Sequence, residues 1–358
     1  MSIVPIYGHE ALRARLSAAI KRGALPASLL LHGPRGVGKQ RLALWIAQSL
    51  VCATPNADAT PCGRCQACRY ALALGHPDVH WFFPRPRLES DATPTDVMSD
   101  YADAIGERAK ASGLYAGSSG SEGIYVATVR AIVQAASVSP AMGKRKVFIV
   151  GDAESMVPQE GSDMAANALL KLLEEPPSNT FIILTSSESG ALLPTIRSRV
   201  VNVRVAALGA HEVEAFLADP AVVDALKRGP KLSVADRVLS AHGAPGTLLE
   251  TSQREIALAG AERLLETALS GDRSKSIRAA MSQGSTKARG AFSDTLDELT
   301  ALLAARARTA VSRGDERIAV GASRAIASVE QAKVLASGNV SPALITASLL
   351  RDLTSALT

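Results

Sequence analysis

The chain has 358 residues, a length that predicts two or three domains rather than a single core. Apolar residues make up 47% and charged residues 20%, a balance typical of globular proteins that excludes a disordered chain. The formal net charge of +5 is spread along the sequence without a basic tract, so charge alone does not indicate a DNA-binding protein.

Membrane and secretory segments are not predicted. The sequence holds no apolar run of about 18 residues, the length that a membrane span needs. Residues 1–10 lack the basic and then apolar pattern of a secretory signal. We therefore expect a protein of the cytoplasm with no membrane partner.

Short apolar runs typical of strands alternate with helical patterns through the first half of the chain. In one helical pattern Val126, Val129 and Val133 fall on the same face. This alternation predicts an α/β fold whose mainly parallel sheet is covered by helices on both faces. Strands are expected at residues 28–31, 79–83, 146–150, 180–184 and 200–205, and helices at 42–50, 126–136 and 164–175.

The pattern changes after about residue 207, where helical segments are separated by glycine and proline. We expect an α/β domain at 1–207, a small helical domain at 208–250 and an all-α domain at 251–358. Residues 84–123 are rich in Pro, Asp, Ser, Gly and Ala. They are expected to form a mobile surface insertion with a short helix near 100–110.

A glycine-rich segment, Gly33-Pro-Arg-Gly-Val-Gly-Lys39, lies between the first predicted strand and a helix. In a P-loop of this kind, Gly33, Gly36 and Gly38 let backbone N–H groups surround phosphate, and Lys39 pairs with the terminal phosphates. The next position requires Ser or Thr, whose hydroxyl holds Mg²⁺, but here it is Gln40. A phosphate cradle with a damaged metal ligand is predicted, so ATP binding should be weak or absent.

An acidic segment follows the predicted strand at 146–150. Asp152 is placed to orient Mg²⁺ through water. ATPases of this type carry next a glutamate that activates the attacking water, and here that residue is Ala153. Glu154 comes one residue late, and we expect it to be a surface carboxylate.

The four cysteines, Cys52, Cys62, Cys65 and Cys68, lie within one short segment. Two overlapping C-x-x-C steps with one further cysteine upstream suit a tetrahedral thiolate zinc site. Two disulfides are the alternative, but a cytoplasmic protein seldom keeps them. We therefore expect structural Zn²⁺ in a module at residues 52–68, with no coordination position left open for catalysis.

Two further segments carry weaker signals. Residues 169–177 predict an amphipathic helix that ends at a double proline, which cannot continue a helix. Residues 192–200 contain Arg199 just before a predicted strand. Taken alone, an arginine in this place is typical of a solvated surface.

Together these segments resemble the clamp-loader branch of the AAA+ ATPases, and within it the bacterial delta-prime type of subunit. The resemblance covers most of residues 1–250 and implies a AAA+ domain followed by a helical lid at 208–250. The helices at 251–358 are similar in topology to the family's collar domain, which joins the subunits. The matching segments are Tyr7-Gly-His-Glu10, the P-loop, the four cysteines, Gly75-His-Pro-Asp78, residues 165–177, residues 195–199 and Gly243-Ala-Pro-Gly246.

The resemblance also implies roles for single residues. Arg199 matches the arginine finger of the family's Ser-Arg-Cys motif, which reaches a neighbouring subunit's ATP site, although Val200 stands in place of the cysteine. Thr185 falls near the position that senses the terminal phosphate, and Gly246 lies where the family's second sensing arginine is missing. The implied partners are gamma/tau and delta subunits, with the sliding clamp and primer-template DNA reached through the assembled complex.

The sequence is compatible with two functions. The first is a non-hydrolysing subunit of the DNA polymerase III clamp loader, which helps to load the sliding clamp during replication and donates Arg199 to a neighbour. The losses at Gln40, Ala153 and Gly246 favour it. The alternative is an active AAA+ ATPase, either a clamp-loader motor subunit or a DNA-remodelling enzyme, and Lys39 with its glycine cradle favours that alternative.

Overall fold

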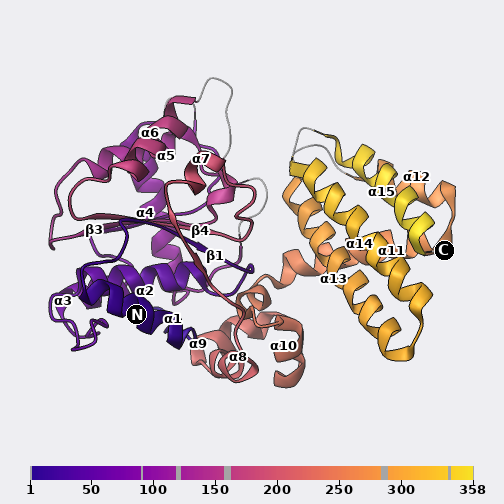
Figure 1. Cartoon of the computed structure of the whole chain (residues 1–358), viewed down its shortest axis with the longest axis horizontal. Coiled ribbons are helices and arrows are strands. Elements are labelled where there is room, and N and C mark those ends of the chain that lie inside the picture. Colours follow the sequence, from indigo (N-terminus) through magenta and orange to yellow (C-terminus); the bar gives the residue numbers. More distant parts are fainter. Residues whose placement is uncertain are drawn as a thin grey trace. The chain divides into compact units, whose positions relative to one another are not determined.

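The computed structural model of the chain describes residues 2–89, 92–117, 122–156, 163–283, 289–337 and 340–357. The chain forms two compact units, one holding Met1–Gly117 and Glu122–Leu249 and the other holding Glu250–Thr358 (Figure 1). The glycine- and serine-rich end of the predicted insertion, at 118–121, lies outside the described residues.

A five-stranded sheet with the order β2-β3-β4-β1-β5 is the centre of the first unit. All neighbouring strands are parallel, and Leu30 of β1 lies opposite Leu184 and Asn202. The inner strands are almost entirely buried, as expected for a parallel sheet covered on both faces. This confirms the predicted parallel sheet. The strands are β1 (Ser28–His32), β2 (Val79–Phe82), β3 (Lys146–Val150), β4 (Thr180–Ser186) and β5 (Val201–Arg204).

Helices lie on both sides of this sheet, with α1 and α2 on one side and α5 and α6 on the other (Figure 1). α2 begins at Lys39, directly after the P-loop, and almost all of its side chains are buried. The helices of this part are α1 (Glu10–Lys21), α2 (Lys39–Val51), α3 (Gln66–Leu72), α4 (Pro94–Lys110), α5 (Val126–Ala136), α6 (Asp163–Glu174) and α7 (Pro194–Arg197), with a 3-10 turn η1 (Ala153–Ser155).

The predicted insertion contains a packed helix, α4, at the place where a short helix was expected. α4 begins with a capping box between Thr93 and Asp96, with Pro94 at its first turn, so its start is locally encoded. Its face carrying Val97 and Tyr101 is buried, and Tyr101 Oη donates to Phe83 O over 2.6 Å. The short helix expected near 100–110 is therefore confirmed, and it begins earlier, at Pro94, in a part that was expected to be a mobile surface segment.

Short helices complete the first unit and have an apolar cluster of their own, which includes Val4, Val213, Leu217 and Val222. They nevertheless belong to the same compact unit as the sheet, so the predicted boundary at 207–208 stays a prediction. They are α8 (Ala210–Leu217), α9 (Pro220–Ala225), η2 (Leu226–Arg228), α10 (Val234–Ala241) and η3 (Pro245–Leu249).

The second unit is built from helices around a core of alanine, leucine and valine. Leu296, Leu299, Leu303 and Leu350 are fully buried in it. Across the described part of the chain, no helix is both long and apolar enough to cross a membrane. The helices are α11 (Thr251–Ser270), α12 (Arg273–Met281), α13 (Arg289–Arg313), α14 (Glu316–Ser337) and α15 (Pro342–Leu357).

Candidate functional site

The predicted P-loop connects the end of β1 to the start of α2. Gly36 and Gly38 have φ angles of +77° and +95°, in the left-handed region that favours glycine. The loop therefore needs glycine at these two positions. The loop also places backbone N–H groups at the N-terminus of the buried helix α2. This arrangement binds anions in other proteins because the unpaired N–H groups and the helix dipole both favour negative charge.

Lys39 turns back into this loop. Its Nζ donates to Gly33 O over 2.9 Å, to Pro34 O over 2.8 Å and to Ser187 Oγ over 2.9 Å. All three protons of the ammonium group therefore have acceptors within the chain. Burial lowers the pKa of Lys39, while Asp152 and Glu154 nearby act in the opposite direction.

Gln40 occupies the position of the magnesium-binding hydroxyl, and both ends of its amide are hydrogen-bonded. Its Nε2 donates to Asp152 Oδ2 over 3.1 Å, and its Oε1 accepts from Trp81 Nε1 over 2.9 Å. A side chain at Gly151 would collide with the Gln40 amide, so the sequence around Asp152 fits this glutamine. The two positions that would share Mg²⁺ in an ATPase are here joined by a direct hydrogen bond.

The position directly after Asp152, where an ATPase carries its base, holds an alanine, which cannot act as one. Ala153 is fully buried, and Thr185 Oγ1 accepts from the Asp152 N–H over 3.1 Å. Glu154 was expected to be a surface carboxylate, but its carboxyl group is enclosed. Its Oε1 accepts from Ser187 N over 2.8 Å, and burial first, then the charge of Asp152, raises its pKa.

The segment containing Gly246 packs directly against the P-loop. Gly246 N donates to Gly36 O over 2.9 Å, and a Cβ added at Gly246 would lie 2.8 Å from that oxygen. A Cβ on Gly36 would in turn lie 2.7 Å from the backbone nitrogen of Thr247. This arrangement leaves no room for an arginine side chain at position 246.

Arg199 lies between α7 and β5. Its guanidinium forms an ion pair with Glu174 at the end of α6 and donates to Thr195 O over 2.8 Å. The side chain remains 28% exposed, so a partner chain can reach it, while Val200 beside it is buried.

The four cysteines meet in one cluster at the end of α2 and the start of α3, with all four sulfur atoms within 4.8 Å of one another. The Cys52–Cys65 and Cys62–Cys68 sulfur pairs are each 3.9 Å apart. Tetrahedral zinc with bonds of about 2.3 Å would separate two thiolates by about 3.8 Å. All four cysteines are free, so the alternative of two disulfides is not what the structure shows.

Backbone and side-chain donors surround these sulfurs. The N–H groups of Cys62, Cys65 and Cys68 each donate to a neighbouring cysteine sulfur over 3.4 Å, and Thr54 Oγ1 donates to Cys62 Sγ over 3.4 Å. Such donors stabilise thiolates. The pKa of Cys62 is lowered to about 5 by the Thr54 hydroxyl and then by backbone N–H groups.

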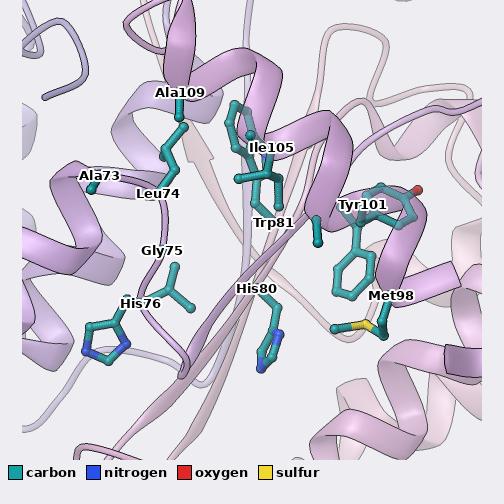
Figure 2. Close-up of a pocket in the computed structure, with 14 residues that line it drawn as sticks. Ala73, Leu74, Gly75, His76, His80, Trp81, Met98, Tyr101, Ile105 and Ala109 are labelled. Carbon is teal, nitrogen blue, oxygen red and sulfur yellow. The ribbon is translucent and has the colours of Figure 1, made fainter. Parts of the chain in front are cut away.

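Sequence reasoning missed several residues of the P-loop region. Trp81 and Ser187 complete the hydrogen bonds of Gln40 and Lys39. Arg108 of α4 lies against three aromatic rings, with its Cζ 4.5 Å from the ring centroid of Trp81, 3.3 Å from that of Phe83 and 3.8 Å from that of Tyr115. None belongs to a local motif, and the packing of α4, β2 and the loop after β4 brings them to this region (Figure 2 shows Trp81 of β2 beside α4).

The parallel sheet and the strand–glycine loop–helix unit define a P-loop-type α/β domain. A family model described as "DNA polymerase III, delta subunit" matches residues 8–209, more than half of the chain. The chain therefore belongs to this DNA polymerase III subunit family.

Individual relatives agree with this family. "DNA polymerase III subunit delta'" of Pseudomonas aeruginosa is 35% identical over 173 residues, which are 48% of this chain and 41% of that protein. "DNA polymerase III subunit gamma/tau" of Mycobacterium bovis is 31% identical over 220 residues, 61% of this chain and 31% of that protein. The chain thus spans less than half the length of these relatives. A solved gamma subunit-related protein of Thermotoga maritima aligns with 96% of this chain and 99% of its own, with a TM-score of 0.38 and 16% identity.

Proposed function

We propose that the chain is a delta-prime type subunit of the DNA polymerase III clamp loader and acts in DNA replication without hydrolysing ATP itself. Membership of the family supports a role in the clamp loader. The hydrogen bond between Gln40 and Asp152 is the main observation in favour of a chain that does not hydrolyse ATP. Mg²⁺ neutralises phosphate charge in phosphoryl transfer, and this bond takes both of its expected ligand positions.

Three further features support the absence of hydrolysis. Lys39 has intramolecular acceptors for all of its protons, so a nucleotide would have to displace them. Ala153 offers no base, and Glu154 is tied to the Ser187 backbone. Gly246 leaves no space for a sensing arginine. On this proposal Gly33, Gly36, Gly38 and Lys39 form a degenerate cradle in which ATP binds weakly or not at all.

Arg199 is proposed to act in trans as an arginine finger at the ATP site of a neighbouring subunit. A guanidinium is permanently charged and planar, which suits stabilisation of a transferring phosphoryl group. The ion pair with Glu174 supports the proposal because it holds Arg199 at the surface in the free chain. The same ion pair is exposed enough to exchange for a phosphate partner at little cost.

Cys52, Cys62, Cys65 and Cys68 are proposed to hold structural Zn²⁺. The sulfur distances and the N–H donors around the sulfurs fit a tetrathiolate site. Four sulfurs close the coordination sphere, so the metal would tie the end of α2 to α3 and perform no catalysis.

The proposed partners are gamma/tau and delta subunits, with the sliding clamp and primer-template DNA contacted through the assembled loader. On this proposal the first unit comprises a AAA+ domain and a lid, and the helices after Glu250 form the collar. The test is co-expression with gamma/tau and delta subunits of the same organism, with the mass of the intact assembly measured. Failure of the chain to join such an assembly would contradict the proposal.

An active ATPase is the second candidate, and the position of Lys39 directly after the glycine loop, at the start of α2, is the observation that favours it. Steady-state ATP turnover by the purified chain separates the two. Saturable hydrolysis that disappears in Lys39→Ala would establish the second candidate. Turnover at the background level supports the first.

A further inference from the structure

The end of α6 meets the segment after α7 through the side chains of Glu174 and Arg199. Glu174 is the last residue of α6, and its Oε1 accepts from Arg199 Nε and pairs with Arg199 Nη2. In a planar guanidinium Nε and Nη2 lie on one edge, so a carboxylate oxygen that contacts both sets the direction of the plane. Within the described residues, no other carboxylate forms an ion pair with Arg199. A single acidic side chain therefore orients this arginine.

The position of Glu174 is fixed by its surroundings in the sequence and in the fold. Pro176 and Pro177 cannot continue the helix, so α6 ends where the glutamate stands. The preceding residue, Leu173, is buried, and its carbonyl oxygen accepts from Ser28 Oγ of β1 over 3.1 Å. The carboxylate of Glu174 is therefore attached to a backbone that the sheet holds in place.

The backbone of Arg199 is also held, but its side chain is not. Ile196 and Val200 on either side of it are buried, and Arg199 N donates to Ile196 O over 3.0 Å. The arginine side chain itself is long, rich in rotamers and partly exposed. Its direction is therefore set by the contacts of the guanidinium rather than by the backbone alone.

These contacts leave part of the guanidinium available to another chain. Glu174 Oε1 takes Nε and one N–H of Nη2, while Nη1 donates to Thr195 O over 2.8 Å and to Ser198 Oγ over 3.3 Å. The second N–H of Nη2 then has no acceptor in the described part of the chain. A phosphoryl oxygen of a neighbouring site would meet this N–H first. It could also replace Glu174 at Nη2 while Nε remains bonded to the carboxylate.

We propose that Glu174 is a positioning residue, which holds Arg199 by its Nε edge and directs Nη2 toward the ATP site of the neighbouring subunit. The inference rests on the proposed function, in which Arg199 acts in trans. Orientation is costly to lose, since a misplacement of about 1 Å at a reacting centre can lower a rate by about 10²-fold. An exposed ion pair, by contrast, contributes little to the stability of a fold. The effect of Glu174 therefore belongs to the rate of hydrolysis and not to folding.

The test is a reconstituted clamp loader that carries Glu174→Ala. Quenched-flow measurement gives the hydrolysis rate at the adjoining site, as the part of the ATP burst that Arg199→Ala removes. We expect this rate to fall by about 10–100-fold, with the KM for ATP unchanged within about twofold, because the neighbour's own P-loop binds the nucleotide. Glu174→Gln should recover part of the rate, since its amide oxygen can still accept from Nε. Glu175→Ala, at the next and exposed glutamate, is the matched control and should leave the rate within about twofold.

A double variant separates positioning from a structural role. Because Glu174 acts through Arg199, the loader with both Glu174→Ala and Arg199→Ala should hydrolyse ATP as slowly as Arg199→Ala alone. In the free chain, ¹⁵N spectra should show the Nε–H of Arg199 exchanging with water at least about fivefold faster in Glu174→Ala than in Glu175→Ala.

Three results would overturn the positioning role while leaving the trans role of Arg199 in place. They are a Glu174→Ala loader as fast as the Glu175→Ala loader, a further loss of rate in the double variant, and equal exchange of the Nε–H in the two single variants. If Arg199→Ala itself does not slow the loader, the proposed trans role is wrong and the positioning role falls with it.

Discussion

Gln40 Nε2 and Asp152 Oδ2 lie 3.1 Å apart, so the residue after the P-loop lysine contacts the acidic residue after β3 directly. The same amide accepts from Trp81, so one side chain connects three elements of the first unit. The P-loop region is thereby closed by the chain's own hydrogen bonds. Its residues have a structural role that can be measured without any nucleotide.

Replacing Gln40 by an apolar residue of similar shape should destabilise the chain. Gln40→Met keeps the volume but leaves Asp152 and the Trp81 N–H without this partner, so we expect a loss of about 1–3 kcal/mol in the free energy of unfolding. Urea unfolding measures it. Gln134→Met, at an exposed position of α5, is the control and should change stability by less than about 0.5 kcal/mol. An equal effect of the two variants would mean that the side-chain hydrogen bonds of Gln40 contribute nothing to stability.

Removing the proposed finger should affect the assembly's chemistry and not the chain's fold. Arg199→Ala in a reconstituted clamp loader should lower hydrolysis at the adjoining motor site by about 10³-fold or more, leaving subunit assembly intact. Arg199→Lys should recover only part of the activity, because an ammonium lacks the planar fork. DNA- and clamp-stimulated ATP turnover is the measurement.

Arg197→Ala is the matched control for Arg199, because Arg197 is exposed and only two residues away. It should leave turnover unchanged. If Arg199→Ala and Arg197→Ala both behave as the unmodified loader, Arg199 is a surface arginine and the trans-acting role is wrong.

The cysteine cluster should carry about one zinc per chain, and Cys62→Ser should lower both metal content and stability. Thr54→Val keeps all four thiolates but removes the hydroxyl that donates to Cys62 Sγ. We expect it to bind zinc about 10–100-fold more weakly. Elemental analysis and competition with a chelator measure the two effects. Protein prepared without chelator that contains no metal would refute the zinc site.

Asp78 should stabilise the chain in a pH-dependent way. It is fully buried, and burial by itself would raise its pKa, but the N–H groups of Ala141, Gly143 and Met142 outweigh this and lower the pKa. Since the folded pKa lies below the unfolded value of about 3.9, the stabilisation is complete above about pH 4 and is lost as the pH falls through the folded pKa. Asp78→Asn should therefore cost about 1.5–3 kcal/mol at pH 7 and progressively less below pH 4.

Unfolding of Asp78→Asn at pH 7 and pH 3 checks this prediction. Asp103→Asn, on the exposed face of α4, is the control and should show little change at either pH. A loss of stability that is the same at both pH values would show that the charge of Asp78 is not responsible.

Much of the sheet could be predicted from the sequence. β3 was expected at the residues where it occurs, because a short apolar run is flanked by polar and glycine residues. α4 was underestimated, since its buried face is carried by few large side chains, among them Val97 and Tyr101. Its start could have been recognised from Thr93, Pro94 and Asp96, which together form a capping signal.

The chemistry of the P-loop region was only partly predictable. The glycines, Lys39 and Gln40 are adjacent in the sequence and were recognised as a motif. Asp152 is 112 residues from Gln40, and their contact depends on the order of the strands. The enclosure of Glu154 depends on Ser187 of the loop after β4, which no local pattern indicates. The cysteines, by contrast, lie close together in the sequence, so their cluster could be expected.

The close approach of Gly36 and Gly246 limits how this chain can change in evolution. An arginine at position 246 would need space that the P-loop backbone already fills, and Gly36 cannot gain a side chain without meeting Thr247. If the chain does not hydrolyse ATP, as proposed, a working nucleotide site would require coordinated substitutions at Gln40, Ala153 and Gly246 together with a shift of η3. On the proposed function, a single substitution would restore at most one of the missing groups, so the site could not return by one change at a time.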